Sequence, residues 1–439
     1  MNERMEIALP ISLDALLLLL LGLSHLWYNP VSSALMVTIM VTYLLLDMVQ
    51  RDHLKTQHPL LTKERLIFTA KLFLATLFIF IAVVLPTLRN IADRHASQPY
   101  MYAHDGLIQT EEAIKFLLVG KNPYTEEYIN TPMAKWQGYS VVFGEEVPAP
   151  LLHNVYLPLP FLFSIPFYLV SKNVLGWYDQ RFVYLLLFIG LLILLPRLTQ
   201  EWSKKLGLLL GFGLNLYFTI FFANGNNDAF VLFWLVLTIF LLQWRQVALS
   251  SVALALACTS KQSALLLLPF YFLYLMRGSC WRESATSILK KTYPFFIISS
   301  LIIVPFLAWD PISFIDDTIN YLAGGSEVSF PIYGHNLGTL LLATGLVESK
   351  QAYFPFWMLQ ALFGLPTLLW LLREQSRDNN VRRVCFNFAI TSFVFGFLSR
   401  YLLDSHLGFI VALFTIAYFS DPTRLSMGES DASEEPRSI

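Results

Sequence analysis

The segment Tyr-Ala-His-Asp-Gly at residues 102–106 places a carboxylate beside an imidazole, directly before a stretch with helical apolar spacing. A positioned carboxylate can act as general base on a hydroxyl group. Asp is also favoured as a helix cap or turn residue, so both interpretations of Asp105 stay open. On the expected helix Ile108–Leu118, Glu111 and Glu112 taken singly fit a solvated face better than a site.

Polar turns also interrupt long apolar segments further along the chain. Residues 224–228 read Asn-Gly-Asn-Asn-Asp, which offers more hydrogen-bonding side chains than a helix cap needs. Lys261 and Gln262 stand in a turn between two short apolar segments. An ammonium at membrane depth is costly and usually faces a cavity or a partner. The alternative for Lys261 is a side chain that snorkels to the membrane interface.

Arg400 lies at the end of an apolar segment, where a guanidinium suits a phosphate at the membrane surface. The alternative is an ion pair with Asp404, four residues on. By contrast, Asp14, Asp47 and Lys71 lack such polar surroundings, and we expect structural or interfacial roles for them. We predict Asp105 as the catalytic base and no metal ligand. The predicted substrate-binding residues are His104, Glu111, Glu112, Tyr124, Asn227, Asp228, Lys261, Gln262, His335, Arg400 and His406.

The composition predicts an integral membrane protein. Of the 439 residues, 56% are hydrophobic and only 14% are charged, against about a quarter charged in globular proteins. Spans of about 20 apolar residues then predict an all-α transmembrane bundle of about 11–13 helices, without a large soluble domain. The balance of 30 Lys and Arg against 31 Asp and Glu argues against nucleic acid as a partner. The three cysteines are odd in number and lack paired spacing, so we expect neither a disulfide framework nor a cysteine metal site.

The positive-inside rule predicts the orientation. Lys and Arg residues between the second and third apolar segments place residues 51–65 in the cytoplasm, with both chain ends on that side. The long loop 89–150 then lies outside, carrying a helix at the membrane interface. Pro158, Pro160 and Pro166 interrupt the next segment, so the span count over residues 151–205 stays open.

We divide the chain into three parts. Residues 1–65 form two extra helices and a cytoplasmic loop. Residues 66–420 form the catalytic module, in which 89–150 is the outer catalytic loop. Residues 421–439 form an acidic cytoplasmic tail that we expect to be disordered.

The order of these motifs resembles that of a known family. The motifs are Asp105, Glu111-Glu112-Ala113, the turn 120–124, Tyr-Leu-Pro-Leu-Pro at 156–160, residues 225–229, and Thr-Ser-Lys-Gln-Ser-Ala at 259–264 followed by Leu268-Pro269. Over residues 66–420 the chain resembles the polyprenyl-phosphate-dependent glycosyltransferases of the GT-C superfamily, and most closely the bacterial multispanning mannosyltransferase-like group.

The resemblance implies sugar transfer, with inversion, from a polyprenyl-phosphate donor to a glycan or lipid acceptor at the outer face of a prokaryotic plasma membrane, among membrane lipids. It implies that Asp105 is the base and that Lys261 and Arg400 lie near the lipid phosphate. Some relatives carry paired acids where this chain has Asp105 followed by Gly106. That departure leaves Glu111 as a rival base and leaves a divalent cation, Mg²⁺ or Mn²⁺, as an open cofactor.

Two other classes of function remain as alternatives. A transporter or flippase for a lipid-linked or polar solute would show inverted repeats and discontinuous helices at the bilayer midplane. No internal repeat stands out in this sequence, and the polar turns gather on one predicted face. A structural scaffold for envelope enzymes would need no such one-sided cluster. Both features favour the enzyme.

Overall fold

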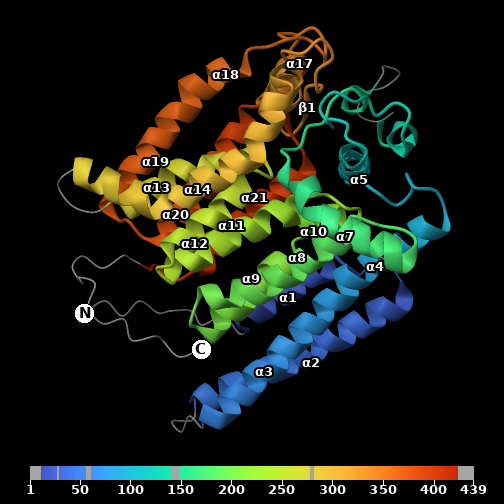
Figure 1. The fold of residues 1–439 in the computed structure, drawn as a ribbon. Coiled ribbons are helices and arrows are strands. Elements are labelled where there is room, and N and C mark those ends of the chain that lie inside the picture. The colour runs from blue at the N-terminus through green and yellow to red at the C-terminus, as the bar shows by residue number, and fades with distance from the viewer. Residues whose placement is uncertain (1–10, 27–28, 56–60, 140–147, 277–280, 424–439) are drawn as a thin grey trace.

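The computed structural model describes residues 11–26, 29–55, 61–139, 148–276 and 281–423, and nearly all their regular structure is helical (Figure 1). The chain begins with α1 (Leu13–Leu23), α2 (Pro30–Lys55), α3 (Leu61–Ile79), the π-turn η1 (Phe80–Val84) and α4 (Leu85–Ala96). The next elements are α5 (Asp105–Leu118), η2 (Pro132–Lys135), η3 (Ala149–Leu151), α7 (Leu159–Leu175), α8 (Arg181–Leu194), η4 (Leu195–Leu198), α9 (Trp202–Gly213) and α10 (Leu216–Ala223).

The second half continues the helical pattern. Its first elements are α11 (Asp228–Gln243), α12 (Val247–Cys258), η5 (Gln262–Leu267), α13 (Leu268–Leu275), α14 (Trp281–Trp309), α15 (Pro311–Ile315), η6 (Asp316–Asn320) and α16 (Tyr321–Ala323). The last are β1 (Tyr333–Gly334), α17 (Leu337–Ala343), α18 (Phe356–Leu359), η7 (Gln360–Gly364), α19 (Leu365–Arg377), α20 (Val381–Phe397), β2 (Tyr401–Leu402) and α21 (Asp404–Phe419).

Five helices of the described residues are long and apolar enough to cross a membrane: Pro30–Gln50, Lys63–Ala96, Arg181–Leu198, Thr286–Trp309 and Phe356–Arg377. Helices α9 and α10 together pass the same test but are bent by 51° at their junction. Six shorter apolar helices accompany them. The prediction of a mostly helical protein with several helices long and apolar enough to span a membrane is therefore confirmed, while the count of 11–13 spans and the orientation stay predictions.

Helix α11 forms the centre of the bundle. Its sequence is apolar nearly all round, and such a helix has to be buried on all sides. It packs against α8 and α12, and α12 in turn packs against α14, while α20 and α21 lie together (Figure 1). Only 17% of the apolar window of Thr286–Trp309 is buried, so this helix keeps an apolar surface turned outward.

Three local features of the structure refine what the sequence predicts. The two short apolar segments that flank Lys261 form α12 on one side and η5 with α13 on the other. Pro158 and Pro160 occupy the N-cap and first turn of α7, where proline is tolerated, so this helix begins only at Leu159. The pairing of β1 with β2 adds a small parallel bridge between Tyr333 and Tyr401 to the expected all-α fold.

The predicted interfacial helix is α5, and it begins at Asp105 rather than Ile108. Residues 106–114 are all buried, including Glu111 and Glu112, so the acidic residues do not form the solvated face that their sequence suggests. The helix instead packs against α7 inside the protein. The predicted acidic tail lies outside the described residues beyond residue 423.

Candidate functional site

A cavity of about 720 Å³ opens where the start of α5, the turn before α11, the turn after α12 and the start of α21 meet. Six of the predicted site residues line it: His104, Asp105, Asn227, Lys261, Gln262 and His406. Much of the remaining wall is aromatic and comes from Trp136, Tyr156, Tyr321, Tyr333 and Tyr401. Segments far apart in the sequence thus converge on one polar space with aromatic walls.

Asp105 is the first residue of α5, and His104 is its N-cap. One carboxylate oxygen, Oδ1, lies 2.7 Å from Nδ1 of His104 and accepts a hydrogen bond of 2.7 Å from the backbone N–H of Gly106. Within the part of the chain that the structure describes, no hydrogen bond reaches the other oxygen, Oδ2. The side chain keeps 17% of its surface exposed, so a molecule in the cavity can reach this carboxylate.

Two loops that carry site residues are fastened to each other. The backbone N–H of His104 donates to the carbonyl of Asn224 over 2.7 Å. The fully buried guanidinium of Arg181 donates to the carbonyl of Tyr102 over 2.7 Å and to that of Ala223 over 3.2 Å. Tyr102 itself has a φ of +53°, a conformation that non-glycine residues rarely adopt without support from their surroundings. Arg181 is therefore a positioning residue for both loops.

Close packing at this end of α5 depends on two glycines. A Cβ atom on Gly106 would lie 1.9 Å from the hydroxyl of Tyr156. Gly225 has a φ of +93°, and its Cβ would lie 2.2 Å from Cδ1 of Leu107. A side chain at either position would push the polar loops apart.

Lys261 supplies the cation of the cavity wall. Its Nζ lies 2.5 Å from Oδ1 of Asp228, and the two side chains are 18% and 6% exposed. The amide of Gln262 donates to the carbonyls of Val155 and Thr318, which fixes this turn to neighbouring segments. His406 accepts a hydrogen bond at Nδ1 from the backbone N–H of Leu403 over 3.2 Å.

The charges around His104 affect one another. Burial lowers the pKa of this imidazole, but the carboxylate of Asp105, helped by that of Asp228, raises it more strongly. The net result is a pKa above the ordinary 6.5. Protonated His104 places a positive charge 2.7 Å from the Asp105 carboxylate.

Three predicted residues on or near α5 lie away from the cavity. Both oxygens of Glu111 bind the guanidinium of Arg94, at 2.9 and 2.8 Å, and one also accepts from the backbone N–H of Gln180. Glu112 pairs with Lys115 at 2.6 Å. The Tyr124 hydroxyl donates to the carbonyl of Tyr156 over 2.8 Å. These contacts hold α5 in place and commit Glu111 to Arg94, which favours Asp105 over its rival.

Arg400 adopts neither of the roles considered from its sequence. Its side chain is 1% exposed and donates to the backbone carbonyls of residues 330, 350, 351 and 352. Asp404 instead pairs with His335 at 2.9 Å, on an exposed part of the surface. Because its guanidinium is occupied by backbone oxygens, Arg400 organises a loop rather than offering itself to a phosphate.

Sequence reasoning missed the aromatic wall. The Trp136 indole N–H donates to the carbonyl of Ala103, and its ring lies 5.7 Å from that of His104. Tyr321 lines the cavity as well, and its buried hydroxyl has no hydrogen-bond partner among the described residues. The abundance of aromatic residues in the loop 89–150 was the one available signal for this wall.

One group of described residues could hold a metal ion, and it lies behind this wall: His153, Asp316 and Asp317. Two aspartates (Asp105 and Asp404), a lysine and two histidines line the cavity itself, which has the size of a small-molecule site. Such a set can accept a proton and stabilise negative charge. A comparison with protein families finds no family that matches this chain, and a comparison with curated proteins finds no match either.

Proposed function

We propose that this protein is a membrane-embedded glycosyltransferase that moves a sugar from a polyprenyl-phosphate donor to a hydroxyl group of a glycan or lipid acceptor at the extracytoplasmic face. One observation carries the proposal. Asp105 and Lys261 line a single cavity at one end of an apolar helical bundle, and Asp228 pairs with the lysine. A general base and a cation beside one cavity in a membrane protein suit a lipid-linked, phosphate-bearing substrate.

In the proposed reaction, Asp105 removes the proton from the acceptor hydroxyl. The acceptor oxygen then forms a bond to the anomeric carbon of the sugar. The bond from that carbon to the phosphate oxygen breaks on the opposite face, and its electron pair leaves with the polyprenyl phosphate. One displacement of this kind inverts the anomeric configuration.

Lys261 would stabilise the charge that develops on the departing phosphate. Asp228 holds the ammonium at the wall, and 18% exposure leaves Lys261 accessible from the cavity. Fixed charges of this kind require little rearrangement during the reaction, which is the basis of electrostatic catalysis. The aromatic residues of the wall, such as Trp136 and Tyr156, offer flat apolar surfaces against which a sugar ring can pack.

The direct test is sugar transfer by membranes that contain the Asp105→Asn variant and a labelled polyprenyl-phosphate sugar. Loss of the base should lower the rate about 10²–10⁴-fold. The matched control is Asp93→Asn, because the Asp93 side chain is 41% exposed and pairs with Arg89 outside the cavity. Unchanged turnover in Asp105→Asn would contradict the assignment.

The bend between α9 and α10 favours a second candidate. A helix broken by 51° within an apolar bundle is a feature of transporters, so a flippase or solute transporter is the alternative. Reconstituted vesicles separate the two functions. Movement of the lipid-linked sugar across the bilayer without transfer to an acceptor would support the transporter and contradict the transferase.

A further inference from the structure

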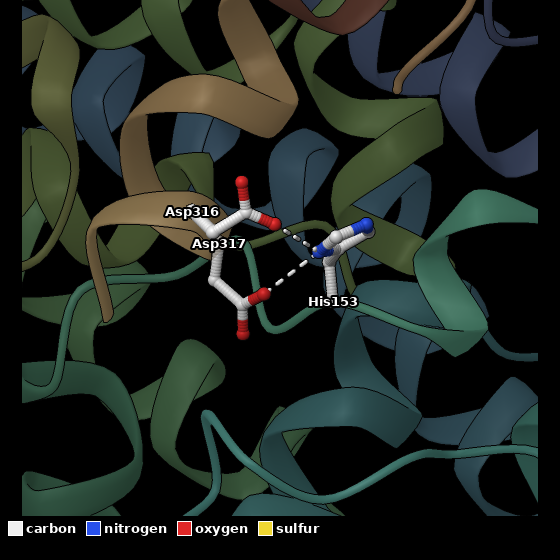
Figure 2. A group of neighbouring side chains, drawn as sticks. All are labelled: His153, Asp316 and Asp317. Carbon is white, nitrogen blue, oxygen red and sulfur yellow. Dashed lines mark hydrogen bonds and ion pairs between the residues drawn. The ribbon is translucent and has the colours of Figure 1, made fainter. Parts of the chain in front are cut away.

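Behind the cavity wall, an imidazole faces two carboxylates (Figure 2). Nδ1 of His153 lies 2.8 Å from Oδ1 of Asp317 and 3.6 Å from Oδ2 of Asp316. One ligand atom from each residue can be chosen so that all three lie within 4.8 Å of one another. Two ligands that each lie about 2.1 Å from a metal ion, at angles near 90–110°, are separated by about 3.0–3.5 Å. The two distances from Nδ1 of His153, 2.8 and 3.6 Å, lie close to this spacing.

Each of the three side chains is also held by its other polar atom. Nε2 of His153 lies 2.9 Å from the carbonyl of Val328. Oδ2 of Asp317 accepts from the backbone N–H of Asn154 over 2.8 Å, and Oδ1 of Asp316 accepts from the hydroxyl of Ser326 over 2.7 Å. Metal-binding His and carboxylate residues typically have such outer partners, which orient the ligand atoms.

The contact with Val328 determines which ring nitrogen of His153 carries the hydrogen in the neutral imidazole. A carbonyl oxygen can only accept, so Nε2 must carry a hydrogen. In the neutral imidazole, Nδ1 then presents a lone pair toward the two carboxylates. Three electron-pair donors that face one another need a positive species between them, either a proton or a metal ion.

The protein provides little other positive charge at this place. Among the described residues, His153 is the only ion-pair partner of Asp316 and of Asp317, and no lysine or arginine pairs with either. The Asp317 side chain is 5% exposed and that of His153 10%. Asp316 is 34% exposed, which gives an ion a route of entry from solvent. Two acids against one imidazole leave net negative charge in a largely buried group.

We propose that His153, Asp316 and Asp317 form a binding site for one divalent cation of the Mn²⁺ or Zn²⁺ type. One imidazole and two carboxylates mix the ligands that zinc and iron favour with those that manganese favours. The site is separate from Asp105 and Lys261, and the proposal does not depend on sugar transfer.

The bound cation would connect two parts of the chain that are more than 160 residues apart. His153 precedes α7, whereas the two aspartates begin η6 between α15 and α16. The His153 ring stacks on Tyr321 with centroids 4.5 Å apart, and Tyr321 lines the cavity. Gln262 donates to the carbonyl of Thr318, the residue after Asp317. Metal binding would therefore stabilise the wall of the cavity from behind.

The test uses the purified full-length protein in detergent after removal of metals with a chelator. Mn²⁺ is added, and the electron paramagnetic resonance signal of free Mn²⁺ measures how much is bound. We expect one equivalent to bind to the wild type and the affinity to fall at least about tenfold in Asp317→Asn and in Asp316→Asn. Zn²⁺ binding is measured in parallel by competition with a coloured chelator.

The matched control is Glu327→Gln, because Glu327 is exposed in the same segment and its loss changes the charge equally. This variant should bind the metal as the wild type does. Because Asp317→Asn could disturb folding, the thermal midpoint is recorded for each variant, and Asp316→Asn serves as the milder substitution at a more exposed position. Mn²⁺ should raise the midpoint of the wild type and of Glu327→Gln.

Two results would overturn the proposal. The first is that the wild type binds neither Mn²⁺ nor Zn²⁺, which would leave a protonated His153 as the positive group. The second is that both aspartate variants, shown to be folded, bind the metal as tightly as the wild type. Since no sugar donor is present, neither result bears on the proposed transferase activity.

Discussion

Two groups of two aspartates and one lysine occupy different parts of the molecule. In the first group, Lys71 lies 2.5 Å from Asp14 and 2.8 Å from Asp47, and all three side chains are 2% exposed. In the second group, Lys261 lies 2.5 Å from Asp228, while Asp105 lines the same cavity as Lys261. There the exposed fractions are 18% for Lys261, 6% for Asp228 and 17% for Asp105.

The two groups differ in how many of their charged atoms stay accessible once the contacts within the protein are formed. In the first group, the Tyr43 hydroxyl donates to Asp14 over 2.6 Å, and the hydroxyl and N–H of Ser12 donate to Asp47. These charges join α1, α2 and α3 and lie outside the cavity that Asp105 and Lys261 line. The second group keeps a carboxylate oxygen and an accessible ammonium. The same residue types can thus be fully paired in one place and line an accessible cavity in another.

The largest effect on stability should come from breaking the first group, Lys71 with Asp14 and Asp47. Lys71→Ala leaves two buried carboxylates without their cation, and removing one partner of a buried ion pair costs about 3–5 kcal/mol. The measurement is thermal unfolding in detergent together with the yield of folded protein. Lys290→Ala on the exposed side of α14 is the control. If Lys71→Ala unfolds like the wild type, this group does not stabilise the helices.

A smaller loss of stability and a specific loss of activity should follow from Lys261→Ala. The ammonium is partly exposed and faces a cavity, so its partner Asp228 can gain solvent when the lysine is removed. Under the proposed mechanism, the transfer rate should fall about 10²–10³-fold. Lys121→Ala is the control, since this lysine is 52% exposed and pairs with Glu126. Equal losses of stability in the two lysine variants, Lys71→Ala and Lys261→Ala, would remove the distinction between the two groups.

His104, which contacts Asp105 of the second group, should make the stability of the protein depend on pH. Its pKa in the folded protein lies above 6.5, because Asp105 and Asp228 outweigh the effect of burial. Its contribution to stability is therefore fully present below about pH 6.5 and is lost as the pH rises through the folded pKa. The difference in thermal midpoint between the wild type and His104→Gln should shrink from pH 6 to pH 9. A constant difference would show that His104 does not titrate in this way.

The smallest effect should come from His335→Ala. His335 pairs with Asp404, and the two side chains are 57% and 47% exposed. Exposed ion pairs contribute about 0–1 kcal/mol, so the thermal midpoint should change little. The sequence predicted His335 as a substrate-binding residue. A strong fall in transfer rate without a change in stability would restore that role.

Part of this organisation could be predicted from the sequence because it depends on neighbouring residues. Apolar segments gave the helices, and polar turns at 104–106, 224–228 and 259–263 gave the residues around the cavity. The expectations for Glu111 and Arg400 were wrong where their contacts depend on partners distant in the sequence. Glu111 binds Arg94 and the backbone at Gln180, and Arg400 binds carbonyls 48 to 70 residues away. Backbone carbonyls carry no sequence signal, so such partners emerge only from the fold.

The separation of 48 to 70 residues between Arg400 and the carbonyls it binds has a consequence for biogenesis. During synthesis, residues 330 and 350–352 are added well before Arg400, whose guanidinium binds their carbonyls. The parallel pairing of β1 with β2 likewise joins Tyr333 to Tyr401. This side of the cavity therefore cannot complete its folding before residues 400–402 have been synthesised. A chain truncated before residue 400 would lose the contacts that hold this wall in place.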